Sequence, residues 1–275
     1  MKPPDRYAVL GHPVSHSRSP WIHARFAAQT SQAMRYEAID VQPAQLAPFV
    51  REFFAGGGRG LNITLPHKVA AAALATQLSE AARAAGAVNT LWQDPAGRLC
   101  ADNTDGVGLA RDLGTNLGIE LTGRRVLLLG AGGAARGIIA ALLQPKPAEL
   151  IIANRTPARA EELAAQFAGI APVRAVALGA LPTPAFDLII NATAASLAGE
   201  TLALPPQILG PDSVCYDLAY QDSGTMFVHW ARAHGIRQAF GGIGMLIEQA
   251  AESFRLWRGV RPNTAPLLAE LSAYR

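Results

Sequence analysis

Lys68 and Asp105 have the clearest potential for chemistry in the first half of the chain. Lys68 is the only lysine between Lys2 and Lys146, and it follows Pro66 at the end of an expected strand. A lysine held in a partly closed cleft can donate or accept a proton, particularly where a carboxylate lies beside it. We interpret the two residues as an acid/base pair in which Asp105 is the partner. The alternative is a solvated lysine at a helix start and an aspartate that caps a helix.

Hydroxyl and amide side chains occupy other strand ends and loops of the same half. Side chains at the carboxyl ends of the strands of an open parallel sheet face the ligand crevice. Such groups suit a small, oxygen-rich substrate, although each alone could equally satisfy a turn or a helix cap. The residues are Ser15, Ser17, Asn62, Thr64 and Asn89.

Three histidines, His12, His16 and His67, lie in these same loops. No carboxylate stands at ligand spacing from them, so we expect no metal site.

A glycine-rich turn follows the apolar run 126–129 in the second half of the chain. Its residues are Gly130-Ala131-Gly132-Gly133-Ala134, and Ala135 completes the spacing G-x-G-x-x-A. Small residues at this turn let backbone N–H groups at a helix start approach a pyrophosphate, which the helix dipole attracts. The alternative is a tight turn that binds nothing. The flanking strand and the expected helix 134–143, which Pro145 should end, favour the dinucleotide site.

The next expected strand, 150–153, indicates which dinucleotide would bind. It leads into Asn154-Arg155-Thr156, 24 residues after Gly130, where an NAD site places a carboxylate for the ribose hydroxyl. Asn154 is neutral, whereas Arg155 and Arg159 could hold a 2′-phosphate through charge-assisted hydrogen bonds. The alternative is that both arginines are solvated surface charges. The pattern therefore favours NADP.

Alternating strands and helices should position these residues. We expect strands at 7–10, 36–40, 60–64 and 88–92, with helices at 21–29 and 45–54, after His67, and at 81–85. This alternation predicts a mostly parallel α/β sheet. A helix 107–117 should lead to the nucleotide-binding unit, which continues with a helix at 157–167 and strands at 187–190 and 214–217. The segment 241–244 is expected to be a hinge, and 245–257 and 265–271 should pack back on the first half.

The fold class expected is therefore α/β, with two α/β domains and a cleft between them. We place the substrate domain at 1–105 plus 245–275, and the Rossmann-type NADP domain at 106–244.

Composition excludes several classes of protein. The chain has 275 residues, of which 50% are hydrophobic and 16% charged, with a net charge of +3 and no basic block. Nucleic acid is therefore not an expected partner. Cys100 and Cys215 fit neither a disulfide framework nor a zinc motif. The chain has no apolar signal core and no apolar run of 18 residues, so we expect a cytoplasmic protein without a membrane partner.

Taken together, the chain resembles the shikimate dehydrogenase family of the bacterial aromatic-amino-acid pathway along its whole length. The segments that carry the resemblance are 11–20, 62–68, 86–90, 102–106, 130–134, 154–156, 217–220 and 242–249. The resemblance implies reversible, NADPH-dependent reduction of 3-dehydroshikimate to shikimate in chorismate biosynthesis. Lys68 would then be the acid/base and Asp105 would orient it. A homodimer is one assembly that the sequence allows.

The resemblance also implies two sets of binding residues. The substrate's hydroxyls and carboxylate would contact Ser15, Ser17, Asn62, Thr64, Asn89, Asp105, Tyr220 and Gln249. The cofactor would contact Gly130, Ala131, Gly132, Gly133, Ala134, Asn154, Arg155, Thr156, Arg159, Thr193, Leu218, Gly242, Met245 and Glu80. No physical argument from the sequence supports Glu80.

The chain departs from the family pattern at two places. Ala194-Ala195-Ser196 stands where the family usually has Ser-Ser-Gly, and Gly241 and Gly244 add flexible positions beside Gly242. We expect a somewhat different hold on the cofactor and a looser hinge.

Two other functions stay open. One is a relative that also accepts quinate or NAD, and the other is a ligand-sensing domain without chemistry. The presence of Lys68 and Asp105 disfavours the second of these.

Overall fold

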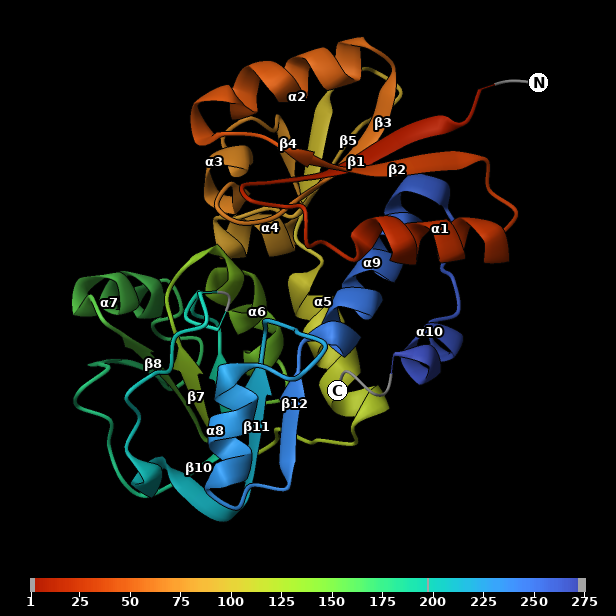
Figure 1. Ribbon diagram of the computed structural model, residues 1–275. Coiled ribbons are helices and arrows are strands. Elements are labelled where there is room, and N and C mark those ends of the chain that lie inside the picture. The colour runs from red at the N-terminus through yellow and green to blue at the C-terminus, as the bar shows by residue number, and fades with distance from the viewer. Residues whose placement is uncertain (1–2, 197, 272–275) are drawn as a thin grey trace.

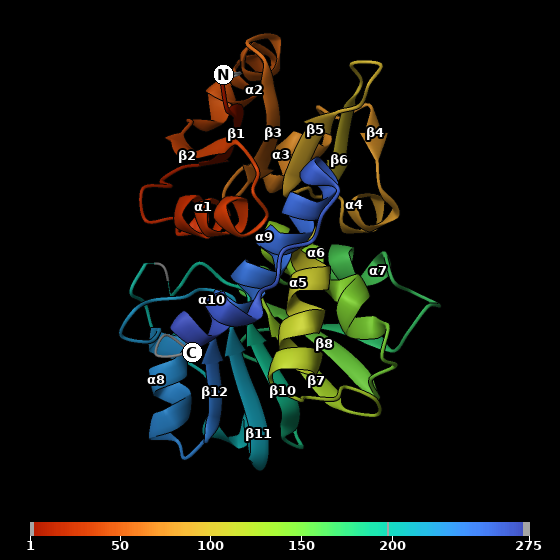
Figure 2. The same cartoon turned by 90° about the vertical axis from the view of Figure 1, so that its right-hand side faces the viewer.

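The computed structural model describes residues 3–196 and 198–271, which form two lobes, each built around one six-stranded sheet (Figure 1). All six strands of the first sheet precede those of the second in the chain. The chain then returns to the first lobe through its last two helices (Figure 2).

The first sheet has the strand order β2-β1-β3-β5-β6-β4. Its middle strands are buried because Ala8, Leu10, Leu61 and Leu91 pack into one apolar cluster. The strands are β1 (Asp5–Gly11), β2 (Met34–Asp40), β3 (Gly58–Ile63), β4 (Gln77–Leu78), β5 (Thr90–Gln93) and β6 (Leu99–Asp102).

This sheet is mixed, and the expected strand 88–92 does not run in the expected direction. β1 pairs in parallel with β2 and β3, and β4 pairs in parallel with β6. β5, however, runs antiparallel to both β3 and β6. The short connection between β5 and β6 makes this a hairpin, because parallel neighbours need a longer crossover. The prediction of a mostly parallel sheet is confirmed, but this strand is an exception.

The second sheet is parallel throughout, with the order β12-β11-β10-β7-β8-β9. This is the doubly wound order of dinucleotide-binding domains. The apolar run of β7 is buried on both faces, as expected for a central parallel strand. The strands are β7 (Arg125–Leu129), β8 (Glu149–Asn154), β9 (Val173–Ala177), β10 (Phe186–Asn191), β11 (Leu209–Asp217) and β12 (Gln238–Gly241).

Helices cover both sheets and join the lobes. In the first lobe they are α1 (Ser19–Gln29), α2 (Leu46–Ala55), α3 (Lys68–Ala72) and α4 (Glu80–Ala85). The others are α5 (Asp105–Arg111), α6 (Gly133–Leu143), α7 (Pro157–Ala165), α8 (Met226–Ala233), α9 (Ile243–Arg258) and α10 (Ala265–Glu270). A π-helical turn, Asp112–Asn116, continues α5, and the two together account for most of the expected helix 107–117.

Two long-range contacts fix the arrangement of the lobes. α5 and α9 lie side by side where the lobes meet (Figure 2). Ile247 and Phe254 of α9 pack with Ile22 and Phe26 of α1, which confirms that the last helices return to the first lobe. The expected hinge is a strand-to-helix turn in which a Cβ on Gly242 would lie 2.3 Å from the Leu218 carbonyl oxygen.

The core of the first lobe contains a histidine that should make the protein sensitive to acid. His23 is fully buried, its ring stacks on Tyr36 at 4.1 Å, and neither of its nitrogens bonds to any described residue. Burial lowers the pKa of His23 to about 3, with the nearby Asn62 amide partly opposing it. The folded state therefore binds this proton less readily than the unfolded state, so stability falls as the pH drops below about 6.5 towards 3.

We expect His23→Phe to remove this part of the pH dependence, because phenylalanine fits an aromatic stack and carries no proton. Between pH 7 and pH 5 the wild-type free energy of unfolding should fall by about 2 kcal/mol more than that of the variant. Urea titrations at the two pH values measure the difference. His229→Gln, at an exposed position, is the control. Equal pH slopes for wild type and His23→Phe would contradict the prediction.

Candidate active site

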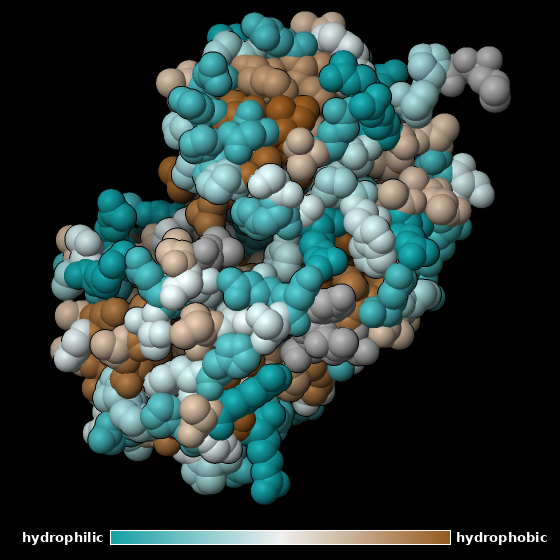
Figure 3. Space-filling model, viewed as in Figure 1, coloured by the Kyte–Doolittle hydropathy of each residue, from teal (hydrophilic) through white to brown (hydrophobic). Residues whose placement is uncertain are grey.

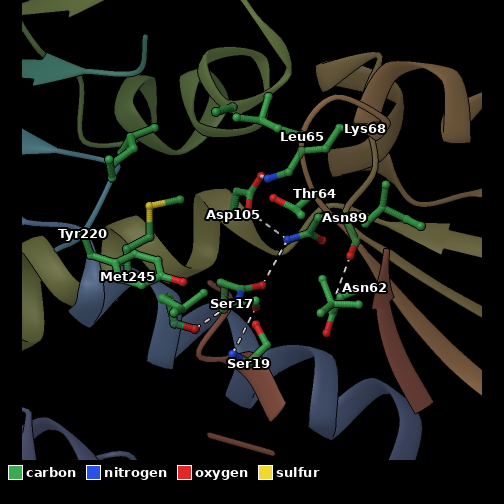
Figure 4. Close-up of a pocket in the computed structure, with 18 of the residues that line it drawn as sticks. Ser17, Ser19, Asn62, Thr64, Leu65, Lys68, Asn89, Asp105, Tyr220 and Met245 are labelled. Atoms are coloured by element: carbon green, nitrogen blue, oxygen red, sulfur yellow. Dashed lines mark hydrogen bonds and ion pairs between the residues drawn. The ribbon is translucent and has the colours of Figure 1, made fainter. Parts of the chain in front are cut away.

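A pocket lies between the two lobes and is lined by residues of the first sheet and its loops and by residues that follow the strands of the second sheet. The space-filling view shows the molecule narrowing where the lobes meet (Figure 3). Inside the pocket, Lys68, Thr64, Asn89 and Asn62 lie on one side, and Tyr220 and Met245 lie on the other (Figure 4).

Lys68 and Asp105 form an ion pair at the wall of this pocket. The Lys68 ammonium donates to Asp105 Oδ2 at 2.5 Å, and the two side chains are only 11% and 5% exposed. Lys68 is the first residue of α3 and Asp105 is the first residue of α5, so the N-terminal ends of these two helices meet at the ion pair. This low exposure keeps the pair largely away from bulk water while both residues still line the pocket. A group in that position can exchange a proton with a bound ligand.

Asn89 fixes the second oxygen of the aspartate. Its amide donates to Asp105 Oδ1 at 2.9 Å and also lies within hydrogen-bond reach of Thr104 and Gln249. The side-chain oxygen of Asn89, Oδ1, accepts from the Thr104 backbone N–H at 2.9 Å. Asn89 is therefore held at several atoms and orients both Asp105 and Gln249.

The side chain of Asn62, on β3, is held in place by hydrogen bonds to neighbouring elements. Tyr36 on β2 donates its hydroxyl to Asn62 Oδ1 at 2.7 Å. The Asn62 side-chain amide donates to the backbone carbonyl of Asn89 at 3.0 Å and to the hydroxyl of Ser253, on α9, at 3.0 Å. The end of β3 and the start of the antiparallel β5 therefore meet at one edge of the sheet, and α9 packs against this edge through Ser253.

The loop between β1 and α1 contributes only part of what the sequence predicted. Ser17 lines the pocket, and its hydroxyl accepts from the backbone N–H of Ser19 at 3.2 Å. Tyr220 comes from the other lobe and accepts from the Arg18 backbone N–H at 3.4 Å, and burial raises the pKa of its hydroxyl. Ser15, by contrast, is exposed and does not line the pocket.

Residues on the loops and helices that follow strands of the second sheet complete the pocket. Those that the sequence assigned to the cofactor and that line it are Ala134, Thr193, Leu218, Gly242 and Met245.

A buried aspartate holds the loops that carry several of these residues. Asp217, at the end of β11, is fully buried, and its Oδ2 accepts from the Ser196 and Thr225 hydroxyls at 2.5 and 2.6 Å. Its Oδ1 accepts from the Ala219 N–H and the Asn191 amide at 3.0 and 3.2 Å. Burial raises the pKa of Asp217, and these four donors oppose the rise. The unusual Ser196 thus ties its loop to the strand end beside Leu218.

The glycine-rich turn has the geometry that a pyrophosphate requires. Gly130 has φ +107°, and a Cβ there would lie 3.0 Å from the Ala192 carbonyl oxygen, so only glycine fits. The space beside Gly132 is open, and no side chain of the described residues caps the first turn of α6. The N–H groups at this helix start are therefore available to an anion. Gly130, Ala131, Gly132 and Gly133 do not line the pocket itself but adjoin it through Ala134.

The second cofactor segment lies at the end of β8. The Asn154 amide donates to the Thr156 carbonyl at 2.9 Å, which shapes the turn before α7. Arg155 and Arg159 are exposed, and neither guanidinium bonds to any residue between 3–196 or 198–271. Two uncommitted cations beside a dinucleotide turn fit a phosphate. Glu80 is exposed at the start of α4 and lies outside the pocket.

Some residues of the site were missed from the sequence. Ser19 and His16 line the pocket, and Asn103 accepts from the Asp105 N–H at 3.1 Å. In the described ranges, no group of three His, Cys, Asp or Glu side chains could hold a metal ion. Every helix described there is too short or too polar to span a bilayer.

A doubly wound sheet whose ligand edge faces a second lobe, with the buried Lys68–Asp105 ion pair at the pocket between them, is the arrangement of a dinucleotide-linked oxidoreductase of a small polar substrate. Family models agree with this class. They match the substrate-binding domain of shikimate dehydrogenase at 9–91, shikimate/quinate 5-dehydrogenase at 112–199 and the shikimate 5′-dehydrogenase C-terminal domain at 242–271. The chain belongs to the shikimate dehydrogenase family.

Individual relatives are similar over their whole length. A shikimate dehydrogenase (NADP(+)) of Alkalilimnicola ehrlichii is 55% identical, covering 97% of this chain and 98% of the relative. That of Methylococcus capsulatus is 54% identical over 100% and 99%. Among solved structures, an Ael1 enzyme from Pseudomonas putida has a TM-score of 0.88 at 44% identity, covering 97% and 98%. Thermus thermophilus shikimate 5-dehydrogenase with NADP(H) and shikimate has a TM-score of 0.84 at 36% identity, covering 98% of each.

Proposed function

We propose that the chain catalyses the reversible, NADPH-dependent reduction of 3-dehydroshikimate to shikimate, a step towards chorismate and the aromatic amino acids. The observation that carries this proposal is the Lys68–Asp105 pair in the wall of a pocket that both lobes line. The family to which the chain belongs supports the choice of substrate and cofactor.

The residues present fit NADP. The uncapped start of α6, the glycine at 130 and the uncommitted guanidiniums of Arg155 and Arg159 are the groups that would hold its phosphates. Thr193, Leu218, Gly242 and Met245 would lie along its reactive end. The cofactor supplies the hydride when it is bound.

The protein's part is to position the carbonyl and to move a proton. Lys68 donates a proton to the carbonyl oxygen during reduction and takes it back from the hydroxyl in the reverse direction. Asp105 holds the ammonium at 2.5 Å and is itself held by Asn89. The substrate hydroxyls and carboxylate would bond to Ser17, Asn62, Thr64, Asn89, Asp105, Tyr220 and Gln249, and Ser15 would join them only if its loop closed.

We further propose that the substrate domain comprises 1–105 and 245–275 and the cofactor domain comprises 106–244; residues 1–2, 197 and 272–275 lie outside the described residues. Glu80 remains part of the proposed cofactor set on resemblance alone. A cytoplasmic location and a homodimer are our working hypotheses for the cellular context.

Initial rates of oxidation of shikimate and of quinate, each with NADP and with NAD, test the function. We expect activity confined to shikimate with NADP. Comparable rates with quinate or NAD would instead establish the broader dehydrogenase, with Arg155 and Arg159 as surface charges. No rate in any combination would favour a ligand-sensing domain.

A further inference from the structure

Gly137, in the second turn of α6, faces the Lys68–Asp105 pair rather than the cofactor loop. A Cβ at this position would lie 2.8 and 2.9 Å from the Asn103 amide atoms and 2.9 Å from Asp105 Oδ2. That oxygen is the one to which Lys68 donates. At Gly137, α6 therefore approaches the proposed acid/base pair with its backbone, without a side chain between them.

The polar groups beside Gly137 have little freedom to move. Asn103 and Asp105 are both buried. The Asn103 amide donates to the Ala87 carbonyl at 2.9 Å, and its oxygen accepts from the Asp105 N–H. A methyl group at 137 would therefore have to displace atoms that are already hydrogen-bonded.

Helix α5 cannot retreat to make room, because its other side is equally close to α9. A Cβ on Gly108 would lie 2.7 Å from Gln249 Cβ and 2.8 Å from the Met245 carbonyl oxygen. On the α6 side, a Cβ on Gly106 would lie 2.9 Å from the Gly137 carbonyl oxygen. α5 is thus in close backbone contact on both sides. A side chain added at 137 would therefore displace the Asn103 amide and the Asp105 carboxylate.

We propose that Gly137 is a positioning residue for the reaction: its missing side chain lets α6 pack against α5 so that Asp105 stays in register with Lys68. This inference rests on the proposed function.

Helix propensity alone predicts that Gly137→Ala is favourable, whereas our proposal predicts that it impairs the enzyme. Alanine is a better helix former than glycine in a helix interior, so Gly137→Ala should stabilise the protein if the position has no other role. Gly114→Ala is the matched control. Gly114 lies in the π-helical turn of the same junction, and the space beside its Cβ is open.

The experiment compares kcat, both KM values and the Kd for NADP in wild type, Gly137→Ala and Gly114→Ala. We expect Gly137→Ala to lower kcat at least tenfold while KM for shikimate and Kd for NADP stay within twofold. Gly114→Ala should match wild type. A kcat within twofold of wild type, or equal losses in kcat and NADP affinity, would overturn the proposal, since the latter indicates a merely structural role.

Asn103→Ala provides a second background in case Gly137→Ala alone does not fold. It removes two of the three close contacts and leaves only the one to Asp105. Adding Gly137→Ala to this background should again lower kcat selectively, and equal kcat values with and without it would refute the role.

A wild-type protein inactive towards every substrate would overturn the proposed function instead. A crystal structure of Gly137→Ala then still tests the steric argument: the Lys68 Nζ–Asp105 Oδ2 separation should lengthen, and an unchanged separation would overturn it.

Discussion

Replacing Lys68 by alanine should lower kcat by about 10²- to 10⁴-fold, the contribution expected of a positioned general acid/base. The KM for shikimate and the Kd for NADP should change little, because the substrate keeps its other polar contacts and Lys68 is not among the residues proposed to hold the cofactor. Steady-state rates in both directions, together with a binding titration for NADP, measure this division between rate and affinity.

Lys68→Arg separates proton transfer from charge. The guanidinium retains the positive charge beside Asp105 but does not give up a proton in proteins. If Lys68 acts as the proton donor, the arginine variant should be nearly as slow as the alanine variant. Wild-type kcat in Lys68→Ala would remove Lys68 from the mechanism, and recovery in Lys68→Arg would reduce its role to electrostatics.

The parts of the site that could be predicted from the sequence share one property: each is local. The apolar run of β7, the glycine-rich turn and the start of α6 are contiguous, so their joint geometry follows from their order. The edge at which Lys68, Asn62 and Asn89 meet follows only in part, because Asn62 lies near the end of β3 and Lys68 begins the helix after it, whereas Asn89 directly precedes β5, which runs antiparallel to β3.

Long-range packing accounts for what could not be predicted. The direction of β5 depends on its hairpin with β6, and no periodicity in 88–93 distinguishes this from a crossover. Helix α8 was missed although Thr225 caps it, accepting from the Val228 N–H at 3.3 Å. A threonine directly before a helix is a start signal that the sequence alone contains, so α8 could have been predicted.

Burial was equally hidden in the sequence. His23 lies within the expected helix 21–29, and only the stack with Tyr36 and Trp257 reveals a histidine held neutral in the core. Gly137 reads as a helix residue of low propensity, and its reason lies 32 residues earlier, at Asp105. Residues whose partners are distant in the chain cannot be assigned a role from spacing alone.

Removing the Arg155 side chain should raise the KM for NADP about 10- to 100-fold and leave the KM for NAD nearly unchanged. Hydrogen bonds to a charged group contribute about 1.5–3 kcal/mol, and only NADP carries the 2′-phosphate that would accept them. The guanidinium is exposed and has no ion-pair partner within the described ranges, so its loss should not destabilise the fold. Rates with each cofactor across a range of concentrations give the selectivity directly.

Asn154→Asp tests the same site from the opposite direction. A carboxylate at the end of β8 would repel the 2′-phosphate and could accept from the ribose hydroxyl of NAD, so selectivity should shift towards NAD. Arg124→Ala is the control, because Arg124 is an exposed cation paired with Asp187 just before β7, at the opposite end of the sheet. If Arg155→Ala and Arg124→Ala both leave the NADP-to-NAD ratio unchanged, Arg155 is a surface charge. The preference must then arise from Arg159 or from the shape of the turn at 154–156.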